Sequence, residues 1–398
     1  MATATLTVPG VYRQEQPERA RPVLPTGVPA FVGLVQANAP VPAGAPITAN
    51  GYGPVALRRK ADFPGGAAAY LEHAVTGFFD NGGDYCYAVG VRADASQAAA
   101  AAGELIKGLQ STSSLSDVDL IAVPDAVALG QTAGAGSITV NETAVRSLQL
   151  AMIQHCTEQA TRLALLDAVP GKDALGVIET QLKPLGVMRA TPVNAALYHP
   201  WVRTVSTNGD FVPPCGHVAG VIARTDALRG VFKAPANAEI QGAIDLQADL
   251  DVDSLGLLNQ AGVNCLRAFA ARGIRIWGAR TLSAAPEWRY LNVRRLVLTI
   301  LRWIDLNMAW AAFEPNVPAL WARIERELKS YLGSLWRAGA LKGEAVNEAF
   351  FVRCDAELNA AASREAGQVI TEIGLAPTLP AEFIVVSVQH RAGTTELI

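Results

Sequence analysis

Charge is scarce in this sequence. Only 17% of its 398 residues are Asp, Glu, Lys or Arg, and 33 basic against 36 acidic residues leave a net charge of −3 at pH 7. A chain so near to neutrality has no overall field that would attract nucleic acid or an anionic membrane surface. We therefore expect no nucleic-acid partner.

Cysteines are few, and they are isolated from one another. The five are Cys86, Cys156, Cys215, Cys265 and Cys354. A disulfide framework or a zinc site requires closely spaced ligands. We expect these cysteines to be buried as small hydrophobic residues of a protein in a reducing compartment.

Short motifs of nucleotide, metal and hydrolase sites are also missing. Gly171-Lys172-Asp173 lacks the upstream glycine and the Ser or Thr of a phosphate-binding loop. Cys215 and His217 are the nearest approach to a nucleophile and its base, in a stretch whose two prolines predict a loop. Catalytic pairs are usually distant in sequence and need a third, orienting group. We expect no metal, no cofactor and no enzymatic activity.

Long apolar runs are absent as well. The richest segment, residues 288–308, is interrupted by four arginines and one aspartate. Its longest uncharged run, 296–301, is far shorter than the roughly 20 residues of a membrane-spanning helix. The first ten residues lack the basic and apolar regions of a signal peptide. The sequence thus predicts no membrane insertion, and folding in a cytoplasm.

What the sequence does have is apolar bulk. Half of the residues are hydrophobic and the mean hydropathy is +0.21, which excludes a disordered chain. The length predicts two to three domains, at about 150 residues each. Low charge on a large apolar chain indicates that much of its surface is covered, by copies of itself in our interpretation.

Strand and helix patterns alternate between residues 31 and 205. Strands are predicted at 85–91, 118–123, 162–169 and 195–202, and helices at 94–109, 141–159 and 172–185. This alternation predicts a doubly wound α/β domain with a parallel sheet. Residues 38–66, rich in Pro, Gly and Ala, are expected to form loops.

Residues 206–381 contain more aromatic residues and arginines. Strands are predicted at 264–269, 272–277 and 350–354, and helices at 287–306 and 318–336. The second helix carries one apolar stripe with its charges on the other side. Arg294 and Arg295, in the first helix, are expected to pair with carboxylates.

Both ends of the chain have a strand pattern without a nearby hairpin partner. Residues 1–30 begin with an alternating stretch, and 382–390 form an apolar run. Such strands must pair elsewhere or with another chain. Head-to-tail contacts made by such arms generate helical polymers. This favours a structural assembly.

An enzyme is the alternative interpretation. Ligands of doubly wound sheets bind at the carboxyl ends of the strands, where Asp125, Asp167 and His199 fall. Two carboxylates and an imidazole could act as acid and base. The competing structural interpretation is that these aspartates end strands and cap the next helix.

Several long segments, in sequence order, resemble contractile tail sheath proteins. They are VPPCGHVAGVIARTDALRGVFKAPAN (212–237), LLNQAGVNCLRAFAARGIRIWGARTLSAAPEWRYLNVRRL (257–296), FEPNVPALWARIERELKSYLGSLWRAGALKG (313–343), FFVRCDAELN (350–359) and AEFIVVSV (381–388). VPGVY (8–12) resembles the start of such proteins. In the middle of the chain the resemblance is weaker, and DVDLIAVPDA (117–126) is its best piece.

The resemblance implies a discontinuous core domain of mixed sheet and helices, with the segment 31–205 inserted and facing outward. It implies an N-terminal arm, 1–30, and a C-terminal arm, 382–398, that complete sheets of neighbouring subunits. The arm residues expected at these contacts are Leu6, Val8, Val11, Tyr12, Phe383, Ile384, Val385, Val386 and Val388.

It also implies stacked six-fold rings around an inner tube, and a contraction that drives the tube through a target envelope without consuming nucleotide. The implied partners are further copies of the chain, the inner tube protein, and baseplate and terminal cap proteins. The implied location is the bacterial cytoplasm during assembly, and then a phage tail or an injection particle, released or membrane-anchored. A non-contractile scaffold of the same fold is a further alternative.

A helix of the core must line the bore of such a tube. We favour 318–336, and its charged residues Arg323, Glu325, Arg326, Glu327 and Lys329 are the candidates for the tube-facing side. Exposed charge contacts are weak and therefore reversible. The alternative is that these charges are simply solvated.

Overall fold

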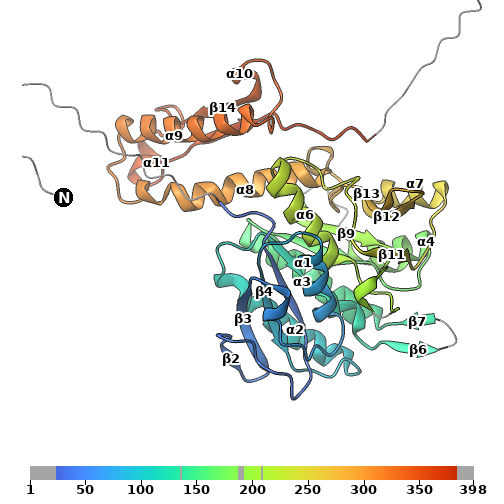
Figure 1. Ribbon diagram of the computed structural model, residues 1–398. Coiled ribbons are helices and arrows are strands. Elements are labelled where there is room, and N and C mark those ends of the chain that lie inside the picture. Colours follow the sequence, from blue (N-terminus) through green and yellow to red (C-terminus); the bar gives the residue numbers. More distant parts are fainter. Residues whose placement is uncertain (1–23, 135–136, 187–191, 208, 383–398) are drawn as a thin grey trace, which may run out of the picture.

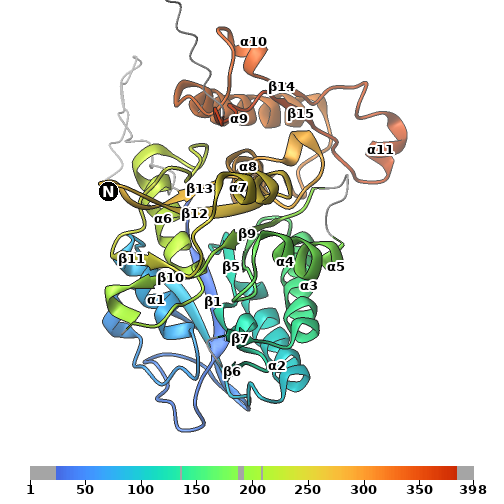
Figure 2. The same ribbon diagram turned by 90° about the vertical axis from the view of Figure 1, so that its right-hand side faces the viewer.

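A nine-stranded mixed sheet runs through the larger part of this computed structural model, which describes residues 24–382 apart from 135–136, 187–191 and 208 (Figures 1 and 2). The strands are β1 (Pro29–Leu34), β2 (Ile47–Thr48), β3 (Gly51–Leu57), β4 (Cys86–Val91), β5 (Leu120–Ala122), β8 (Leu163–Asp167), β9 (Ala195–His199), β12 (Val263–Phe269) and β13 (Gly273–Trp277). Their order is β13-β12-β9-β8-β5-β1-β4-β3-β2. The six strands from β12 to β4 are parallel, and the outer ones are antiparallel. The predicted α/β class is confirmed.

The loop expected at residues 38–66 is only partly a loop, because β2 and β3 lie within it. β3 contains two glycines and Pro54, which are typical of turns. The strand tolerates them because its pairing with β4 is irregular between Tyr52 and Val55. Pro54 lies in this irregular stretch, where its missing N–H costs no regular hydrogen bond between the strands. Gly51 is needed there, since a Cβ would lie 1.9 Å from the Gly90 carbonyl oxygen.

The sheet continues across the boundary expected between residues 205 and 206. β12 pairs in parallel with β9, so that Val263 lies opposite Leu197 and Cys265 opposite His199. The division into an inserted outer domain (31–205) and a core domain (206–381) therefore stays a prediction about positions in an assembly.

Helices cover both faces of the sheet. α2 (Ala98–Ser111), α3 (Glu142–Gln159) and α7 (Val252–Gln260) cover one face, while α1 (Leu71–Asp80) and α6 (Cys215–Arg229) cover the other. β1 contributes to both cores, because Ala30, Val32 and Leu34 face one and Phe31 faces the other. Short elements link the layers: β6 (Thr132–Gly134), β7 (Ser137–Thr139), α4 (Ala174–Gly176), α5 (Lys183–Leu185), β10 (Val202–Thr204) and β11 (Ala243–Leu246).

Small residues allow α1 and α6 to cross closely. A Cβ on Gly216 would lie 2.3 Å from the Ala74 Cα, and one on Gly220 would lie 2.4 Å from the Phe78 carbonyl oxygen. The loop predicted around Cys215 and His217 is therefore wrong, because both residues lie in the first turn of α6 and are buried. The apolar residues around that helix give it no amphipathic pattern.

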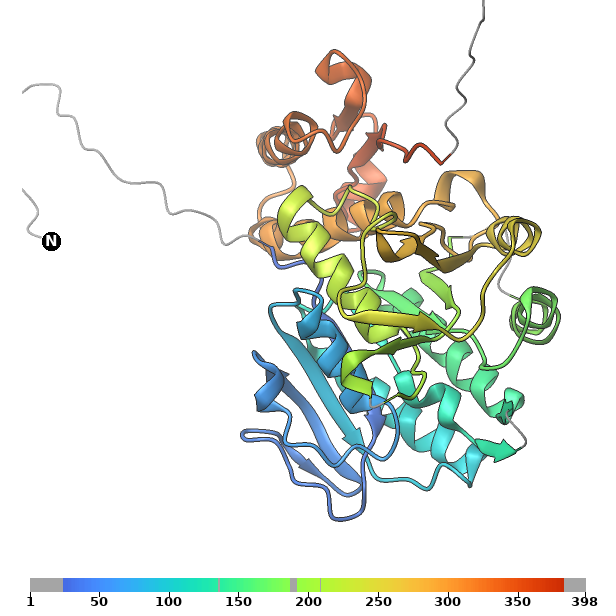
Figure 3. The same ribbon diagram turned by 45° about the vertical axis from the view of Figure 1, so that its right-hand side comes forward.

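A C-terminal layer lies on α8 (Leu291–Asn307), which separates it from the sheet (Figures 1 and 3). The layer contains α9 (Pro318–Arg337), α10 (Val346–Ala349), β14 (Phe350–Arg353), α11 (Ala361–Glu365) and β15 (Glu372–Leu375). The apolar stripe predicted on α9 packs against α8. Trp303 of α8 and Tyr331 of α9 stack with ring centroids 3.9 Å apart. α8 begins four residues later than expected, after a 3-10 turn at Pro286–Trp288.

Three arginines join α8 to the sheet. Arg295 donates to both carboxylate oxygens of Asp226 in α6, at 2.8 and 2.6 Å, and to Asp119 before β5, at 2.9 Å. Arg302 donates to the carbonyl oxygen of Asp117 at 2.8 Å. The predicted carboxylate partners are confirmed for Arg295. For Arg294 the prediction is wrong, because it donates to the side chain of Asn194 at 2.6 Å.

The guanidinium of Arg295 is charged although only 3% of its side chain is exposed. Burial alone would lower its pKa, but Asp226 and Asp119 together raise the pKa above the usual value. Burial raises the pKa of the Asp226 carboxyl, and Arg295 counteracts that rise. The ion pairs therefore offset a large cost of desolvation, and each partner requires the others.

Arg295→Met is expected to reduce the free energy of unfolding by about 3–5 kcal/mol, because it leaves the carboxylate of Asp226 buried without a cation and leaves Asp119 with Arg302 alone, at 4.0 Å. The control is Lys60→Met, which removes an exposed ion pair with Asp80 at 3.3 Å, for about 0–1 kcal/mol. Urea unfolding measures both losses. Equal losses in the two variants would contradict the assigned role of the buried network.

Candidate subunit-interaction surfaces

The predicted arm residues lie outside the described residues, from Leu6 to Tyr12 at one end and from Phe383 to Val388 at the other. The structure shows instead how the first and the last described residues are held. These two segments are called the N-terminal and C-terminal roots below.

The N-terminal root is Leu24 to Val28. Leu24 packs into the apolar cluster between α8 and α9. The backbone amides of Gly27 and Val28 donate to the carboxylate of Asp119 at 3.0 and 2.7 Å. Gly27 has φ +70, and a Cβ there would lie 2.5 Å from the Cα of Ala223. The single carboxylate of Asp119 thus binds both the N-terminal root and Arg295.

The C-terminal root is Thr378 to Glu382. Arg280 donates to both oxygens of this carboxylate, at 3.0 and 2.5 Å, and the Tyr290 hydroxyl donates at 3.4 Å. The hydrogen bonds and the charge of Glu382 raise the pKa of Arg280. The Asn292 side-chain amide donates to the carbonyl oxygen of Thr378 at 3.3 Å. Both roots are therefore held at the N-terminal half of α8.

β14 and β15 form a hairpin-like ladder in the C-terminal layer. Phe350 pairs with Leu375 and Arg353 with Glu372. Within the described ranges this sheet has two strands, so each strand has one edge without a neighbouring strand. Unpaired strand edges accept further strands through main-chain hydrogen bonds.

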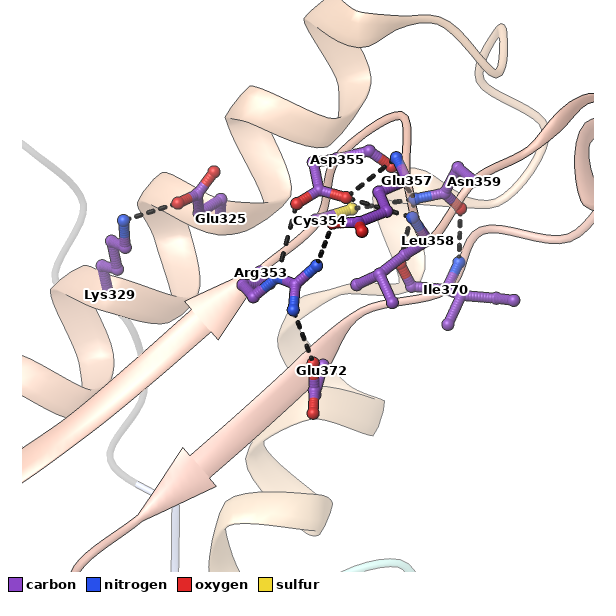
Figure 4. A network of polar contacts seen from close by, with 10 residues as sticks. All are labelled: Glu325, Lys329, Arg353, Cys354, Asp355, Glu357, Leu358, Asn359, Ile370 and Glu372. Carbon is purple, nitrogen blue, oxygen red and sulfur yellow. Dashed lines mark hydrogen bonds and ion pairs between the residues drawn. The ribbon is translucent and has the colours of Figure 1, made fainter.

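Negative charge gathers at the end of this ladder (Figure 4). Arg353 lies 3.4 Å from Asp355, 2.8 Å from Glu357 and 3.6 Å from Glu372. These carboxylates raise the pKa of Arg353. Three carboxylates against one guanidinium leave an excess of two negative charges at an exposed position.

The charged side of α9 is exposed, as its pattern predicts, and most of its charges are paired. The Arg323 guanidinium lies over the Trp310 ring at 3.6 Å and 3.6 Å from Glu327, and Lys329 lies 2.5 Å from Glu325. Arg326 is exposed and has no ion pair in the part of the chain that the structure describes. A contact between this side and a tube stays a prediction.

The strand-end candidates of the enzyme alternative are buried, and the two aspartates among them accept hydrogen bonds from backbone amides. Asp125 accepts hydrogen bonds from the backbone amides of Leu34 and Tyr70, and Asp167 accepts one from the amide of Cys215 at 2.9 Å. Each carboxylate therefore holds the N-terminus of a helix, α1 or α6, that is distant in sequence. His199 is also buried. The structural interpretation that each aspartate caps the next helix is wrong, because the helices they meet, α1 and α6, are distant in sequence.

Burial shifts the pKa values of these groups. It raises the pKa of Asp125 and of Asp167 to about 7, and backbone or side-chain hydrogen bonds counteract part of the rise. Burial lowers the pKa of His199 and of His217 to about 4. The pKa of Cys215 rises well above its usual value through burial and the nearby Asp167, so its thiol is a poor nucleophile.

The five cysteines are buried and free, as predicted. Nowhere in the described ranges do three His, Cys, Asp or Glu side chains gather as metal ligands. None of the helices described here combines the length and the apolar character needed to cross a membrane.

Asp167→Asn is expected to destabilise the protein more at pH 5 than at pH 7. The folded-state pKa of about 7 exceeds the usual 3.8, so the native carboxyl keeps a proton that the unfolded chain releases. This stabilisation is complete below about pH 4 and is lost as the pH rises to 7. Urea unfolding should show a difference of about 1.4 kcal/mol per pH unit.

Asp245→Asn is the control for that measurement, because the hydrogen bond from Arg203 lowers the pKa of Asp245. Its carboxyl stays ionised in both states at pH 5 and 7, so its effect should be the same at both. A loss for Asp167→Asn that does not depend on pH would contradict a protonated native carboxyl.

Sequence and structure comparisons place the chain among tail sheath proteins. The family description for the phage tail sheath protein central domain matches residues 134–282, and that for the phage tail sheath C-terminal domain matches 283–391. A prophage major tail sheath protein of Pseudomonas aeruginosa is 28% identical over 176 residues, which is 43% of this chain and 44% of that protein. The chain thus matches less than half the length of this relative.

Solved structures match over nearly the whole chain. A chain of the anti-feeding prophage baseplate has a TM-score of 0.73 and 26% identity, and the match covers 98% of this chain and all of the other. A chain of an extracellular contractile injection system, from the PVC sheath complex in its contracted state, has a TM-score of 0.70 and 28% identity, with 97% and 98% covered. Because two sheath domains account for residues 134–391 and the fold extends over the rest, the chain belongs to the family of contractile tail sheath proteins.

Proposed function

We propose that this chain is the structural subunit of a contractile sheath, built from stacked six-fold rings around an inner tube. The observation that carries the proposal is the match over 97–98% of the chain to chains of assembled particles, one of them a sheath complex in its contracted state and one a six-fold symmetrised baseplate. The low charge and the apolar bulk of the chain are consistent with a surface covered by further copies.

The two arms are proposed to connect the subunits. The proposed arm residues adjoin roots that are held on α8. The open edges of β14 and β15 offer the main-chain groups that such strands need. Strands Leu6–Tyr12 and Phe383–Val388 of neighbouring copies are the proposed occupants. Flexing beyond the roots would let subunits move while these pairings persist.

Contraction is proposed to draw on interface energy stored during assembly. A gain of even a few kcal/mol per subunit sums over all copies of a polymer. No nucleotide or cofactor is required in this scheme, and an enzymatic activity has no role in it. The proposed partners are the inner tube protein, the baseplate and terminal cap proteins. The proposed setting is assembly in a bacterial cytoplasm into a phage tail or an injection particle, released or membrane-anchored.

Truncation of residues 1–23 tests the polymer. The full-length chain is expected to form striated six-fold tubes in negative-stain electron microscopy, in the contracted state because that state is lower in energy. The truncated chain keeps its root on Asp119, so it should stay folded and monodisperse. A chain in which a Gly/Ser linker replaces 1–23 controls for length and should also fail to polymerise.

Dispersed particles from the full-length chain would overturn the proposal, and tubes from the truncated chain would overturn the role of the arm. Tubes that never occur in an extended form with the inner tube would favour a non-contractile scaffold.

The charged side of α9 is proposed to face the inner tube. Arg326→Glu reverses its unpaired cation and is expected to weaken co-sedimentation with the cognate tube protein about tenfold at low salt, and less at high salt. Lys342→Glu, an exposed reversal outside α9, is the control and should bind as the wild type does. Unchanged binding by Arg326→Glu would show that this side is merely solvated.

A further inference from the structure

The end of the β12–β13 hairpin has a partly exposed face. Arg267 lies opposite Arg275, and Phe269 opposite Gly273, so these residues share a side of the sheet with Trp277. Toward the start of β12 this side is covered by α7, through Leu258. Farther along, Trp277 is 41% exposed.

This surface combines aromatic rings with cations. The Phe269 and Trp277 ring centroids lie 4.8 Å apart, and the guanidinium groups of Arg267 and Arg272 lie 5.0 and 5.6 Å from the Phe269 ring. Arg267, Phe269, Arg272, Arg275 and Trp277 are together called the basic aromatic face.

Most of the positive charge of this face is not neutralised. Arg275 has Glu239 at 3.8 Å, whereas Arg267 and Arg272 have no ion pair within the described ranges. Exposed Trp and Arg side by side are the composition of binding hot spots, and the Phe269 ring already has two guanidinium groups near its face. The face therefore fits a partner that brings carboxylates together with an apolar side chain.

Such a surface occurs on the C-terminal layer of the same chain. In the β14–β15 ladder, Phe351 and Arg353 lie on one side, with Glu372 opposite Arg353. Phe351 is 47% exposed, and Asp355 and Glu357 add the excess negative charge seen in Figure 4. These five residues are called the acidic hairpin face.

The two faces lie on different layers, since β12 and β13 belong to the sheet and β14 and β15 to the layer beyond α8 (Figure 2). We propose that the basic aromatic face of one copy docks on the acidic hairpin face of a second copy. Their charges are opposite, and each has an exposed aromatic side chain among them. The contact is heterologous, so it extends into a polymer rather than closing a dimer. The inference rests on the proposed sheath function and adds to it a contact between subunit bodies, separate from the arms.

A charge swap tests the contact. Arg267→Glu/Arg272→Glu is expected to raise the concentration needed for tube formation at least about tenfold, because like charges then face each other. Glu357→Arg/Glu372→Arg should raise it similarly. All four changes in one chain restore opposite charges and should restore assembly to within a few-fold of the wild type. Sedimentation and electron microscopy measure the assembled fraction.

Two further variants separate charge from folding. Arg58→Glu/Arg59→Glu places the same reversal on exposed arginines after β3 and should leave assembly unchanged. Arg267→Gln/Arg272→Gln should weaken assembly several-fold without any reversal, and thermal unfolding by circular dichroism checks that each variant folds.

The outcomes are distinct. If the wild type forms tubes and the charge-reversed variants assemble normally, the docking is overturned. It is also overturned if the variant with all four substitutions stays dispersed, because the basic aromatic face then serves another occupant such as the tube. Absence of tubes from the wild type overturns the proposed function itself, and the docking with it.

Discussion

The buried cation of Arg295 is the constraint on which the arrangement of the chain depends. A guanidinium in the interior must have carboxylates at the right places, and Asp226 and Asp119 supply them from α6 and from the start of β5. Asp119 also holds the amides of Gly27 and Val28. One charge therefore fixes α8 against the sheet, α6 against α8, and the first described residues against both. Removal of Arg295 would leave the buried carboxylate of Asp226 without a cation.

This constraint places both ends of the described chain on one helix. The N-terminal root meets α8 through Asp119 and Arg295, and Glu382 meets its start through Arg280 and Tyr290. Any pull on either arm in an assembly would act on α8, which is packed on the sheet through one side and on α9 through the other. In the proposed sheath, both arms would thus connect to the body of the subunit at this helix.

Local pattern was enough to predict the central strands and α9, because their periodicity reflects burial on one or two sides. It failed for α6, which is apolar all round and follows two prolines, and for β3, whose glycines and Pro54 resemble a turn. Pairing between Arg295 and Asp119, 176 residues apart, has no local signal. Charge on α9 was visible in the sequence, whereas the basic aromatic face depends on strand register, which only the fold supplies. The sheath family itself was predicted from long segments in order, and it is confirmed.

The positions of the ion pairs match what a contracting polymer would demand of them. Contacts inside one subunit must persist, and those of Arg295 are buried, where salt screens them much less than it screens exposed pairs. Contacts between subunits or with a tube must form and break, and the charges available for them, on α9, on the β12–β13 hairpin and around Arg353, are exposed. Exposed pairs contribute little individually, so no single one would lock a state. Many of them acting together can still favour one arrangement of subunits over another, since a small difference per copy is multiplied along the polymer.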